Sequence, residues 1–372
     1  MKKIAIIFGT RPEAIKMVPI IKLLEGEYRN SFTYRLISTG QHDTMLRQVL
    51  DFFQIRPDYT LNLMTEDQKL SELTANCLSS MEKILKKENP DLVLVQGDTA
   101  TTLASAISAF YNRISIGHIE AGLRTYDKYQ PFPEESNRRV VDALSDFCFA
   151  PTESNRENLL NESIPGDKIF VTGNTVIDTL LLIKKQYKDR LNVQFKSFNL
   201  ENEKIILVTA HRRENFGENI KNICKALVKI AQVFTEHTIV YPVHENPNIK
   251  NVVTSMLAGK SNIRLLLPLN YIEFISLLAN SYLILTDSGG IQEEAPVFGK
   301  PVLVMREKTE RMEGIDSGIA KLVGTEPERI FSNVEELIKN RKVYDKMANG
   351  RNPYGDGMAG RKILEALKRK LT

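Results

Sequence analysis

Short apolar runs alternate with amphipathic segments along the chain, and this alternation constrains the fold more than any other feature. Buried runs separated by segments of helix length are typical of parallel strands joined by crossover helices. Because such crossovers are right-handed and cover both faces of a sheet, we predict a doubly wound, Rossmann-like domain in the first half. Its expected strands are Ile4–Phe8, Tyr34–Ser38, Leu92–Gln96, Ile114–Ile119, Phe147–Ala150 and Ile169–Val171, with helices near residues 12–26, 42–53, 68–89, 99–112 and 134–146.

The second half of the chain repeats this scheme. At 372 residues the chain is too long for one ordinary domain and fits two. The predicted fold class is therefore α/β, with two Rossmann-like doubly wound domains facing across a cleft. The second set of expected strands is Ile205–Thr209, Thr238–Pro242, Ile263–Leu266, Tyr282–Leu285 and Pro301–Val304, with helices near residues 217–235, 246–257, 271–279, 289–298 and 327–349.

The pattern also predicts domain boundaries. We expect an N-terminal Rossmann-like domain over residues 1–172, a connecting region over 173–203 and a C-terminal Rossmann-like domain over 204–356. A last helix, over 357–372, is expected to pack back on the N-terminal domain. Ligands of open α/β sheets bind at the carboxyl ends of the strands, so the residues that directly follow each strand are the candidates for a site.

Composition excludes several classes of protein. The chain is 42% hydrophobic and 26% charged with a formal charge of +4, which gives no case for a nucleic-acid partner. The cysteines Cys77, Cys148 and Cys224 are far apart and form no C-x-x-C motif, which favours a reducing compartment over disulfides or a zinc site. No apolar run approaches the length of a signal peptide or a membrane span, so we expect a cytoplasmic protein without a membrane partner.

The segment from Asp287 to Pro296 is the most informative of the strand ends. It follows an apolar run and opens a short helix with Ser288-Gly289-Gly290. Free backbone N–H groups at a helix start favour anions, and glycines let a phosphate approach the backbone closely. Glu293 and Glu294 follow one turn later, where a carboxylate could accept hydrogen bonds from sugar hydroxyls. The alternative interpretation is a helix start capped by Asp287 or Ser288.

Two cations follow the first expected strand. Arg11 and Lys16 lie near the start of a helix that Thr10 can cap and Pro12 can begin. Cations do not complement the dipole at a helix N-terminus, so an anionic ligand would account for them. The alternative is a pair of surface cations beside a well-capped helix.

Three carboxylates stand at the ends of separate elements of the first sheet. Asp98 follows one strand, Glu120 follows the next, and Glu134 or Glu135 opens a helix. Each has an ordinary alternative, as a helix cap or a first-turn acid. If the three carboxylates lie close together, however, their like charges raise one another's pKa values. One carboxyl group can then keep its proton and act as an acid while another is ionised and acts as a base.

His211 directly follows a strand and precedes Arg212, a position suited to an anion or a reacting oxygen. His42 and His244 also stand at strand ends, whereas His118 lies within a strand and is expected to be a core residue. No histidine pair has a recognised metal-ligand spacing, and the chain has neither a nucleophile elbow nor a dinucleotide-binding or Walker loop. We therefore expect no metal and no cofactor.

Six segments of the chain form a specific set: Phe8–Met17, Gln96–Thr99, His118–Arg124, Pro133–Glu135, His211–Asn215 and Asp287–Glu294. Together they resemble the non-hydrolysing UDP-N-acetylglucosamine (UDP-GlcNAc) 2-epimerases, and they cover nearly the whole chain in that family's order. The resemblance implies the GT-B fold with nucleotide binding in the C-terminal domain, a homodimer, no nicotinamide, and reversible conversion of UDP-GlcNAc to UDP-N-acetylmannosamine (UDP-ManNAc), which supplies ManNAc for cell-surface polysaccharide.

The family's chemistry accounts for several carboxylates in one protein. The proton on C2 of the sugar is only weakly acidic until the C1–O bond breaks and UDP leaves. A base then removes that proton to give 2-acetamidoglucal, and a proton returned to the opposite face inverts C2 before UDP adds back. Two faces of C2 require more than one acid or base. The departing diphosphate requires preorganised donors.

The resemblance also assigns roles to single residues. Asp98, Glu120 and Glu134 match the acid and base carboxylates, and His211 matches the residue that contacts the diphosphate or assists departure of UDP. The residues that match substrate contacts are Arg11, Lys16, Ser288, Gly289, Gly290 and Arg311 for the diphosphate or uridine, Glu294 for the ribose and Phe274 beside the uracil.

The chain departs from the family pattern in two respects. Met312 follows Arg311 where the family often has proline. Members activated by a second UDP-GlcNAc have Gln-His-Arg-Gln and Arg-Gln-Thr-Leu, whereas this chain has Gln41-His42-Asp43-Thr44 and Asp67-Gln68-Lys69-Leu70. These losses weigh against allosteric activation. The residues that remain as candidates for that second site are Gln41, His42, Arg212 and His244. The alternatives to the epimerase are a hydrolysing epimerase that releases free ManNAc and UDP, a GT-B glycosyltransferase, and a catalytically silent nucleotide-sugar sensor.

Overall fold

The computed structural model describes residues 1–40, 44–61, 63 and 69–371. The chain forms two compact units: unit 1 comprises Met1–Leu182 and Gly355–Thr372, and unit 2 comprises Ile183–Tyr354. The division falls inside helix α7 (Thr175–Gln186), which helix α8 (Lys188–Lys196) follows. The segment expected to be a connecting region is thus mostly helical and is shared between the units.

Unit 1 contains a parallel sheet in the order β3-β2-β1-β4-β5-β6-β7. Its apolar strands are buried on both faces, as expected for a parallel sheet covered by helices. The strands are β1 (Lys2–Phe8), β2 (Phe32–Ser38), β3 (Tyr59–Thr60), β4 (Leu92–Gln96), β5 (Ser115–Ile119), β6 (Phe147–Ala150) and β7 (Ile169–Val171).

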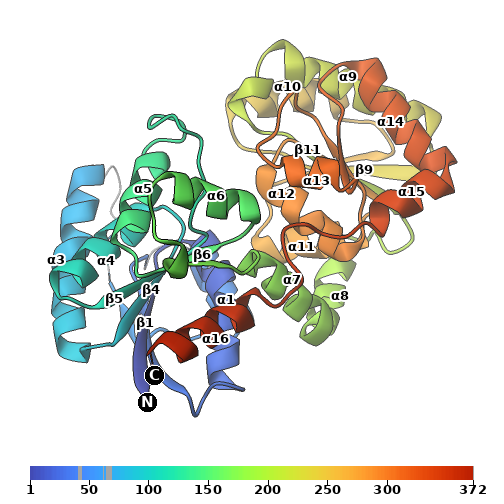
Figure 1. Cartoon of the computed structure of the whole chain (residues 1–372). Coiled ribbons are helices and arrows are strands. Elements are labelled where there is room, and N and C mark those ends of the chain that lie inside the picture. Colours follow the sequence, from blue (N-terminus) through green and yellow to red (C-terminus); the bar gives the residue numbers. More distant parts are fainter. Residues whose placement is uncertain (41–43, 62, 64–68, 372) are drawn as a thin grey trace. The chain divides into compact units, whose positions relative to one another are not determined.

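Helices cover both faces of this sheet (Figure 1). Helices α3 (Leu70–Glu88), α4 (Ala100–Tyr111) and α5 (Glu134–Leu144) pack side by side over a core that includes residues of β1, β4 and β5. On the other face, α1 (Arg11–Glu25) contacts α2 (Thr44–Phe52) and α16 (Ala359–Leu371).

The last helix, α16, is bound to the rest of unit 1 through Asp178 of α7. The buried carboxylate of Asp178 accepts the backbone N–H of Gly360 at 2.9 Å and that of Ala359 at 3.2 Å. These N–H groups have no partner within the first turn of a helix, so the carboxylate satisfies both.

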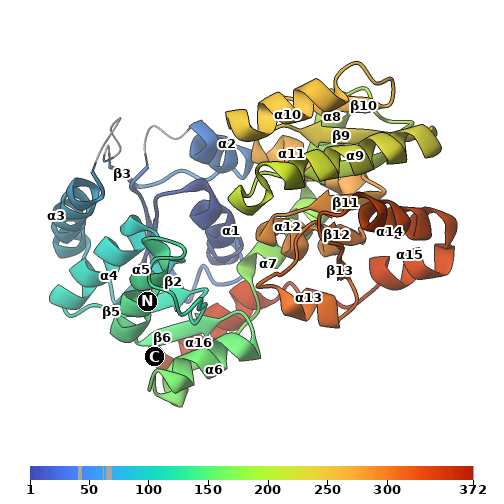
Figure 2. The same ribbon diagram turned by 90° about the horizontal axis from the view of Figure 1, so that it is seen from above.

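Unit 2 contains a second parallel sheet, in the order β10-β9-β8-β11-β12-β13. Figure 2 labels β9, β10, β11, β12 and β13 of this sheet. Two doubly wound parallel sheets confirm the predicted α/β class. The strands are β8 (Lys204–Thr209), β9 (His237–Pro242), β10 (Ile263–Leu266), β11 (Leu283–Thr286), β12 (Val302–Val304) and β13 (Ala320–Leu322).

Each face of the second sheet has its own apolar core. Helices α9 (Glu218–Val233), α10 (Pro247–Leu257), α14 (Pro327–Lys339) and α15 (Arg341–Ala348) form one core with the strands. Helices α8, α11 (Tyr271–Asn280) and α12 (Gly289–Glu294) contribute to the other.

Two expected helices of unit 2 are interrupted. The helix predicted over 289–298 is α12 followed by a 3₁₀ turn at Ala295–Phe298, because Pro296 offers no backbone N–H. The helix predicted over 327–349 breaks at Asn340, whose side chain caps α15 by accepting from Val343 N. Among the short elements that the pattern missed are β3, β13, α6 (Glu153–Asn161) and α13 (Met312–Asp316).

The strand order reverses between β1 and β4 in unit 1 and between β8 and β11 in unit 2. Ligands of doubly wound sheets bind at such reversals, outside the carboxyl ends of the strands. The turns after β1, β4 and β5 in unit 1, and after β8 and β11 in unit 2, are therefore the places to look for a site. Over the described ranges, no helix is long and apolar enough to cross a membrane.

Candidate active site

The turns after β1 and β4 are tied together by one buried carboxylate. Glu13 accepts the backbone N–H of Gly9 at 2.8 Å and the hydroxyl of Thr99 at 2.6 Å. Gly9 has no room for a side chain, since a Cβ there would lie 2.3 Å from the hydroxyl oxygens of Thr39 and Thr101. Glu13 therefore holds together the two turns at the strand reversal, the one after β1 and the one after β4.

Glu120 follows β5 in a backbone conformation that is rare for a residue with a side chain, with φ at 69°. Lys16 Nζ lies 2.7 Å from Oε1, Gln96 Nε2 donates to Oε2 at 2.5 Å, and Asn174 Nδ2 donates to Oε1 at 3.3 Å. The carboxylate is thus held by donors from three separate parts of unit 1. Backbone strain fixed by such a network is typical of a functional position.

Asp98 follows β4 and is bound by Arg138 of α5. Nε of Arg138 donates to Oδ2 at 3.0 Å, and Nη2 of the same guanidinium donates to the same oxygen. Burial raises the pKa of Asp98, and the neighbouring Glu120 carboxylate raises it further, whereas Arg138 and Lys16 oppose the change. Asp98 therefore retains its proton to a higher pH than an exposed aspartate, which suits a group that both takes and gives a proton.

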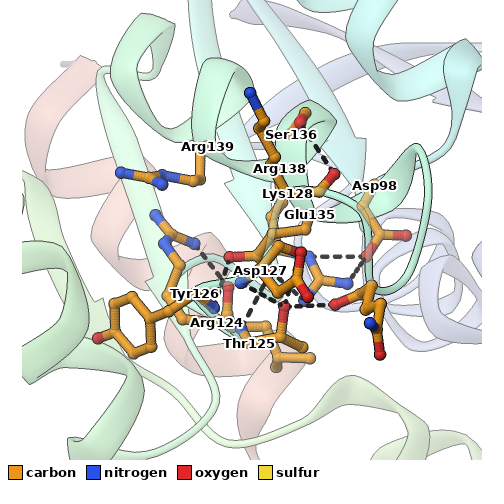
Figure 3. A network of polar contacts seen from close by, with 12 residues as sticks. Asp98, Arg124, Thr125, Tyr126, Asp127, Lys128, Glu135, Ser136, Arg138 and Arg139 are labelled. Carbon is orange, nitrogen blue, oxygen red and sulfur yellow. Dashed lines mark hydrogen bonds and ion pairs between the residues drawn. The ribbon is translucent and has the colours of Figure 1, made fainter.

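Arg138 lies between two carboxylates (Figure 3). Besides Asp98, it binds the fully buried Glu135, with Nη1 3.2 Å from Oε2. Glu135 also accepts the backbone N–H groups of Thr125 and Tyr126, at 3.1 and 3.2 Å. The loop after β5 and the Asp98 carboxylate are thereby held by one ion-pair network.

Glu134 does not belong to this network. It is partly exposed in the first turn of α5 and, among the residues that the structure describes, its carboxylate has no hydrogen-bond or ion-pair partner. The structure thus brings Asp98 and Glu120 close enough to interact, and in the described part of the chain no hydrogen bond or ion pair joins the third predicted carboxylate to them.

His118 is a core residue, as predicted. Its Nδ1 lies 2.6 Å from Oδ1 of Asp142 and its Nε2 lies 2.7 Å from the carbonyl oxygen of Gly97. A carbonyl can only accept, so Nε2 carries a proton. His118 consequently holds the turn that presents Asp98.

The two cations after β1 differ in their surroundings. Lys16 is paired with Glu120, so it compensates a carboxylate of its own chain. Arg11 is partly exposed in the first turn of α1, with Nη1 3.4 Å from Sδ of Met45, and within the described ranges it pairs with no carboxylate. Of the two, only Arg11 has the surroundings predicted for a cation that awaits an anionic ligand.

In unit 2, the turns after β8 and β11 are joined by Asp287. Its Oδ2 accepts the backbone N–H groups of His211 and Arg212, at 2.8 and 2.9 Å, and the side-chain amide of Asn215 at 2.9 Å. Asp287 therefore does not cap α12. That position belongs to Ser288, whose side chain makes no capping hydrogen bond.

His211 stands beside Asp287 and against a second histidine. Its Nδ1 lies 3.6 Å from Oδ1 of Asp287, and its ring stacks on that of His244 with centroids 5.7 Å apart and planes at 13°. Burial lowers the pKa of His211, Asp287 raises it, and His244 and Arg212 lower it further.

A cluster of arginines surrounds the first residue of α12. A Cβ at Gly289 would lie 2.8 Å from Oε1 of Glu310, and this carboxylate pairs with Arg212 at 3.1 Å, Arg311 at 3.2 Å and Arg306 at 2.7 Å. Burial alone would raise the pKa of Glu310, but the guanidiniums, Arg311 foremost, lower it to about 2. The three guanidinium groups can therefore bind an anion, and the carboxylate of Glu310 is the anion that they bind in this structure.

The remaining predicted substrate contacts of unit 2 are Gly290, Glu294 and Phe274. A Cβ at Gly290 would meet no atom within 4 Å, so space is open there. Of the acidic pair, Glu293 binds Arg311 Nε at 2.9 Å, whereas Glu294 is only partly buried. Phe274 is partly buried against the core formed by α8, α11 and α12. Gln41 and His42 lie outside the described residues.

Sequence reasoning missed several partners of these groups. The spacing of Glu135 and Arg138 is a signal that could have been used, because residues three apart meet on a helix. Gln96, Asn174 and Glu310 are joined to their partners by the tertiary fold, and no local pattern marks them. In the described part of the chain, no group of three or more His, Cys, Asp or Glu residues is placed to hold a metal ion.

Two doubly wound parallel sheets, each with charged side chains where its strand order reverses, define the class of two-domain α/β proteins of GT-B type. A family model, UDP-N-acetylglucosamine 2-epimerase, matches residues 25–368. The chain belongs to this family.

Individual relatives agree with the family over the full length. The chain is 49% identical over 374 residues to the UDP-N-acetylglucosamine 2-epimerase of Neisseria meningitidis, covering 98% of this chain and 99% of that protein. A crystal structure of the Neisseria meningitidis enzyme bound to UDP-GlcNAc has a TM-score of 0.87 at 47% identity, covering 99% and 100% of the chains. The Methanocaldococcus jannaschii enzyme in complex with UDP-GlcNAc and UDP has a TM-score of 0.79 at 36% identity, covering 99% of each chain.

Proposed function

We propose that the protein is a non-hydrolysing UDP-GlcNAc 2-epimerase that interconverts UDP-GlcNAc and UDP-ManNAc by elimination and re-addition of UDP. The observation that carries this proposal is the pair of carboxylates that follow β4 and β5 of unit 1, Asp98 and Glu120. Glu120 is paired with Lys16, and Asp98 has a raised pKa. Two carboxylates in such different environments suit a base and an acid that act on opposite faces of one carbon.

The reaction would proceed in balanced steps. The C1–O bond breaks with its electron pair going to UDP, and a carboxylate removes the C2 proton to leave 2-acetamidoglucal. A second carboxylate returns a proton to the other face of C2, and UDP re-adds at C1. Asp98 and Glu120 are our candidates for these transfers, with Glu134 as a third.

We assign UDP binding to unit 2. Ser288, Gly289 and Gly290 would contact the diphosphate together with Arg311, and His211 would assist its departure. Glu294 would bind the ribose, and Phe274 would lie beside the uracil. The proposal is supported by the arginine cluster at Gly289 and by the relatives whose structures contain UDP-GlcNAc or UDP. In unit 1, Arg11 and Lys16 are our candidate contacts for an anionic substrate.

Incubation with UDP-GlcNAc in deuterated water tests the mechanism. We expect UDP-ManNAc to appear with deuterium at C2, read by NMR and mass spectrometry, and the remaining UDP-GlcNAc to gain deuterium at the same carbon. UDP-ManNAc without deuterium at C2 would contradict a solvent-exchanging elimination. Accumulation of free ManNAc and UDP would instead identify the hydrolysing alternative, and transfer of the sugar to an acceptor with C2 unchanged would identify a glycosyltransferase.

The family also motivates three properties of the protein in the cell. We propose a homodimer, a cytoplasmic location and the supply of ManNAc units for cell-surface polysaccharide. Light scattering of the purified protein tests the first, and fractionation tests the second. Deletion of the gene followed by sugar analysis of the surface tests the third.

A further inference from the structure

The carboxylate of Asp287 uses only one of its two oxygens. Oδ2 accepts three hydrogen bonds from the turn after β8, whereas Oδ1 is buried and, within the described ranges, has no hydrogen-bond partner. The Asp287 side chain is fully buried. An unsatisfied oxygen on a buried carboxylate costs free energy, so it calls for an explanation.

A potential donor to this oxygen is the ring of His211. Nδ1 of His211 lies 3.6 Å from Oδ1, which is too long for a hydrogen bond but requires only a small turn of the ring to close. Oδ2 of the same carboxylate binds the backbone N–H of His211 at 2.8 Å. The backbone of His211 is therefore fixed relative to Asp287, and only the side-chain torsions separate the two groups.

The ring on the other side of His211 is itself fixed. Nδ1 of His244 accepts the backbone N–H of Asn246 at 3.1 Å, so the neutral form of His244 carries its proton on Nε2. His244 can therefore stack on His211 without taking the place of Asp287 as the acceptor for Nδ1–H. The side chain of His211 is 42% exposed, which leaves its ring room to turn.

We infer that Asp287 is the positioning residue of His211, accepting its Nδ1–H and leaving Nε2 for the ligand. In the neutral ring this arrangement selects the tautomer with the proton on Nδ1. When the ring is protonated, Nε2–H becomes a donor and Oδ1 of Asp287 faces the positive charge.

The hydrogen bond between His211 and Asp287 does not depend on the proposed function. Its part in the catalytic cycle rests on that function. In the epimerase, a protonated His211 would donate Nε2–H to the departing diphosphate and keep it close enough to add back. The charged and titratable groups around the ring are Asp287 after β11, His244 after β9 and Arg212 in its own turn. Of these, only Asp287 favours the positive form.

The test reads the tautomer directly. In the full-length protein labelled with ¹⁵N-histidine, two-bond ¹H–¹⁵N correlations assign the protonated nitrogen of each ring, and His211→Gln identifies the signal of His211. With UDP present, we expect neutral His211 to carry its proton on Nδ1. A proton on Nε2 in the neutral form would overturn the inference, whatever the enzymatic activity.

The variant Asp287→Asn sharpens the result. Its amide oxygen can replace Oδ2 and keep the three hydrogen bonds, while its NH₂ group replaces Oδ1 and puts a donor against Nδ1. A donor there selects the opposite tautomer, and we expect the pKa of His211 to fall by about one pH unit. If the variant fails to fold, the tautomer measured in the wild-type protein still tests the inference.

A matched control separates positioning from general loosening of the turn. Tyr241→Phe removes a hydrogen bond of 2.8 Å to Ala210 O, next to His211, and keeps the three hydrogen bonds that Asp287 accepts. We expect it to leave the tautomer and kcat unchanged. Asp287→Asn should lower kcat with little change in UDP affinity. Equal losses in both variants would overturn the inference, and absence of epimerase activity in the wild type would refute the proposed function alone.

Discussion

Lys16 Nζ lies 2.7 Å from Oε1 of Glu120, although 104 residues separate the two in the chain. Both side chains are largely buried, so each depends on the other for compensation of its charge. The pair joins α1 to the end of β5. It places the ammonium group of Lys16 beside the carboxylate of Glu120, the residue with the unusual backbone conformation.

Lys16→Met should lower the free energy of unfolding by about 2 kcal/mol, because it leaves a mostly buried carboxylate without its cation. Urea denaturation at pH 7 measures the change. Lys22→Met, on the same helix, removes an ion pair with Glu25 that is more exposed, and we expect it to cost less than about 0.5 kcal/mol. Equal effects of the two substitutions would contradict the structural importance of the Lys16–Glu120 pair.

Arg138→Met should move the pKa of Asp98 further upward, because Arg138 opposes the effect of burial. The limb of the pH–rate profile that requires ionised Asp98 is then expected to shift to higher pH. Arg139→Met is the matched control, since Arg139 is the next residue of α5 but pairs with Glu162 at 3.3 Å. A pH profile that responds equally to both substitutions would exclude the proposed role of Arg138.

Asp98→Asn and Glu120→Gln should each lower turnover by about 100-fold or more, the usual loss when an acid or base is removed. Initial rates of UDP-ManNAc formation measure this, with thermal unfolding to verify that each variant folds. Near-normal rates in both variants would show that other groups transfer the protons. Glu134→Gln, measured beside them, tests whether a carboxylate outside the Asp98–Arg138–Glu135 network takes part.

Asp178 should make the stability of the protein depend on pH. Burial raises its pKa to about 6, so the folded chain binds this proton more tightly than the unfolded chain does. The resulting stabilisation is full below about pH 4, the ordinary pKa of aspartate, and is lost as the pH rises through about 6. Urea denaturation from pH 4 to 7 should show this trend in the wild type and in Asp167→Asn, an exposed control, and less of it in Asp178→Asn.

Glu310→Gln should tighten the binding of UDP, because the carboxylate of Glu310 occupies the arginine cluster at Gly289 that the diphosphate would use. We expect an affinity gain of about 3- to 10-fold at low salt that shrinks as salt screens the charges. Calorimetric titration measures it. Glu307→Gln, in the same loop but facing Arg329 at 4.0 Å, is the control. Unchanged affinity in Glu310→Gln would mean that UDP binds elsewhere.

The alternation of apolar runs predicted most strands and helices, because each crossover unit carries its own periodicity. It missed β3 and β13, since two or three paired residues leave no pattern. The strand ends were also informative: Asp98, His211 and Asp287 follow strands that flank a reversal of strand order, and Glu120 follows β5, the neighbour of β4.

What the sequence could not provide is the pairing of these side chains. Lys16 was predicted to bind an anionic ligand, and no pattern indicated that it also pairs with Glu120. Asp287, considered as a helix cap, holds the turn of His211. Such contacts depend on how the sheet brings distant turns together, and local periodicity carries no information about them.

The hydrogen bonds from Ala359 and Gly360 to Asp178 have a consequence for the order of folding. Unit 2 is a continuous piece of chain, whereas unit 1 is interrupted after Leu182 and resumes at Gly355. During synthesis, domains generally fold as units as they emerge from the ribosome. Unit 2 can therefore complete its core while unit 1 still lacks a helix from one face of its sheet, and the first domain to be made is the last to be finished.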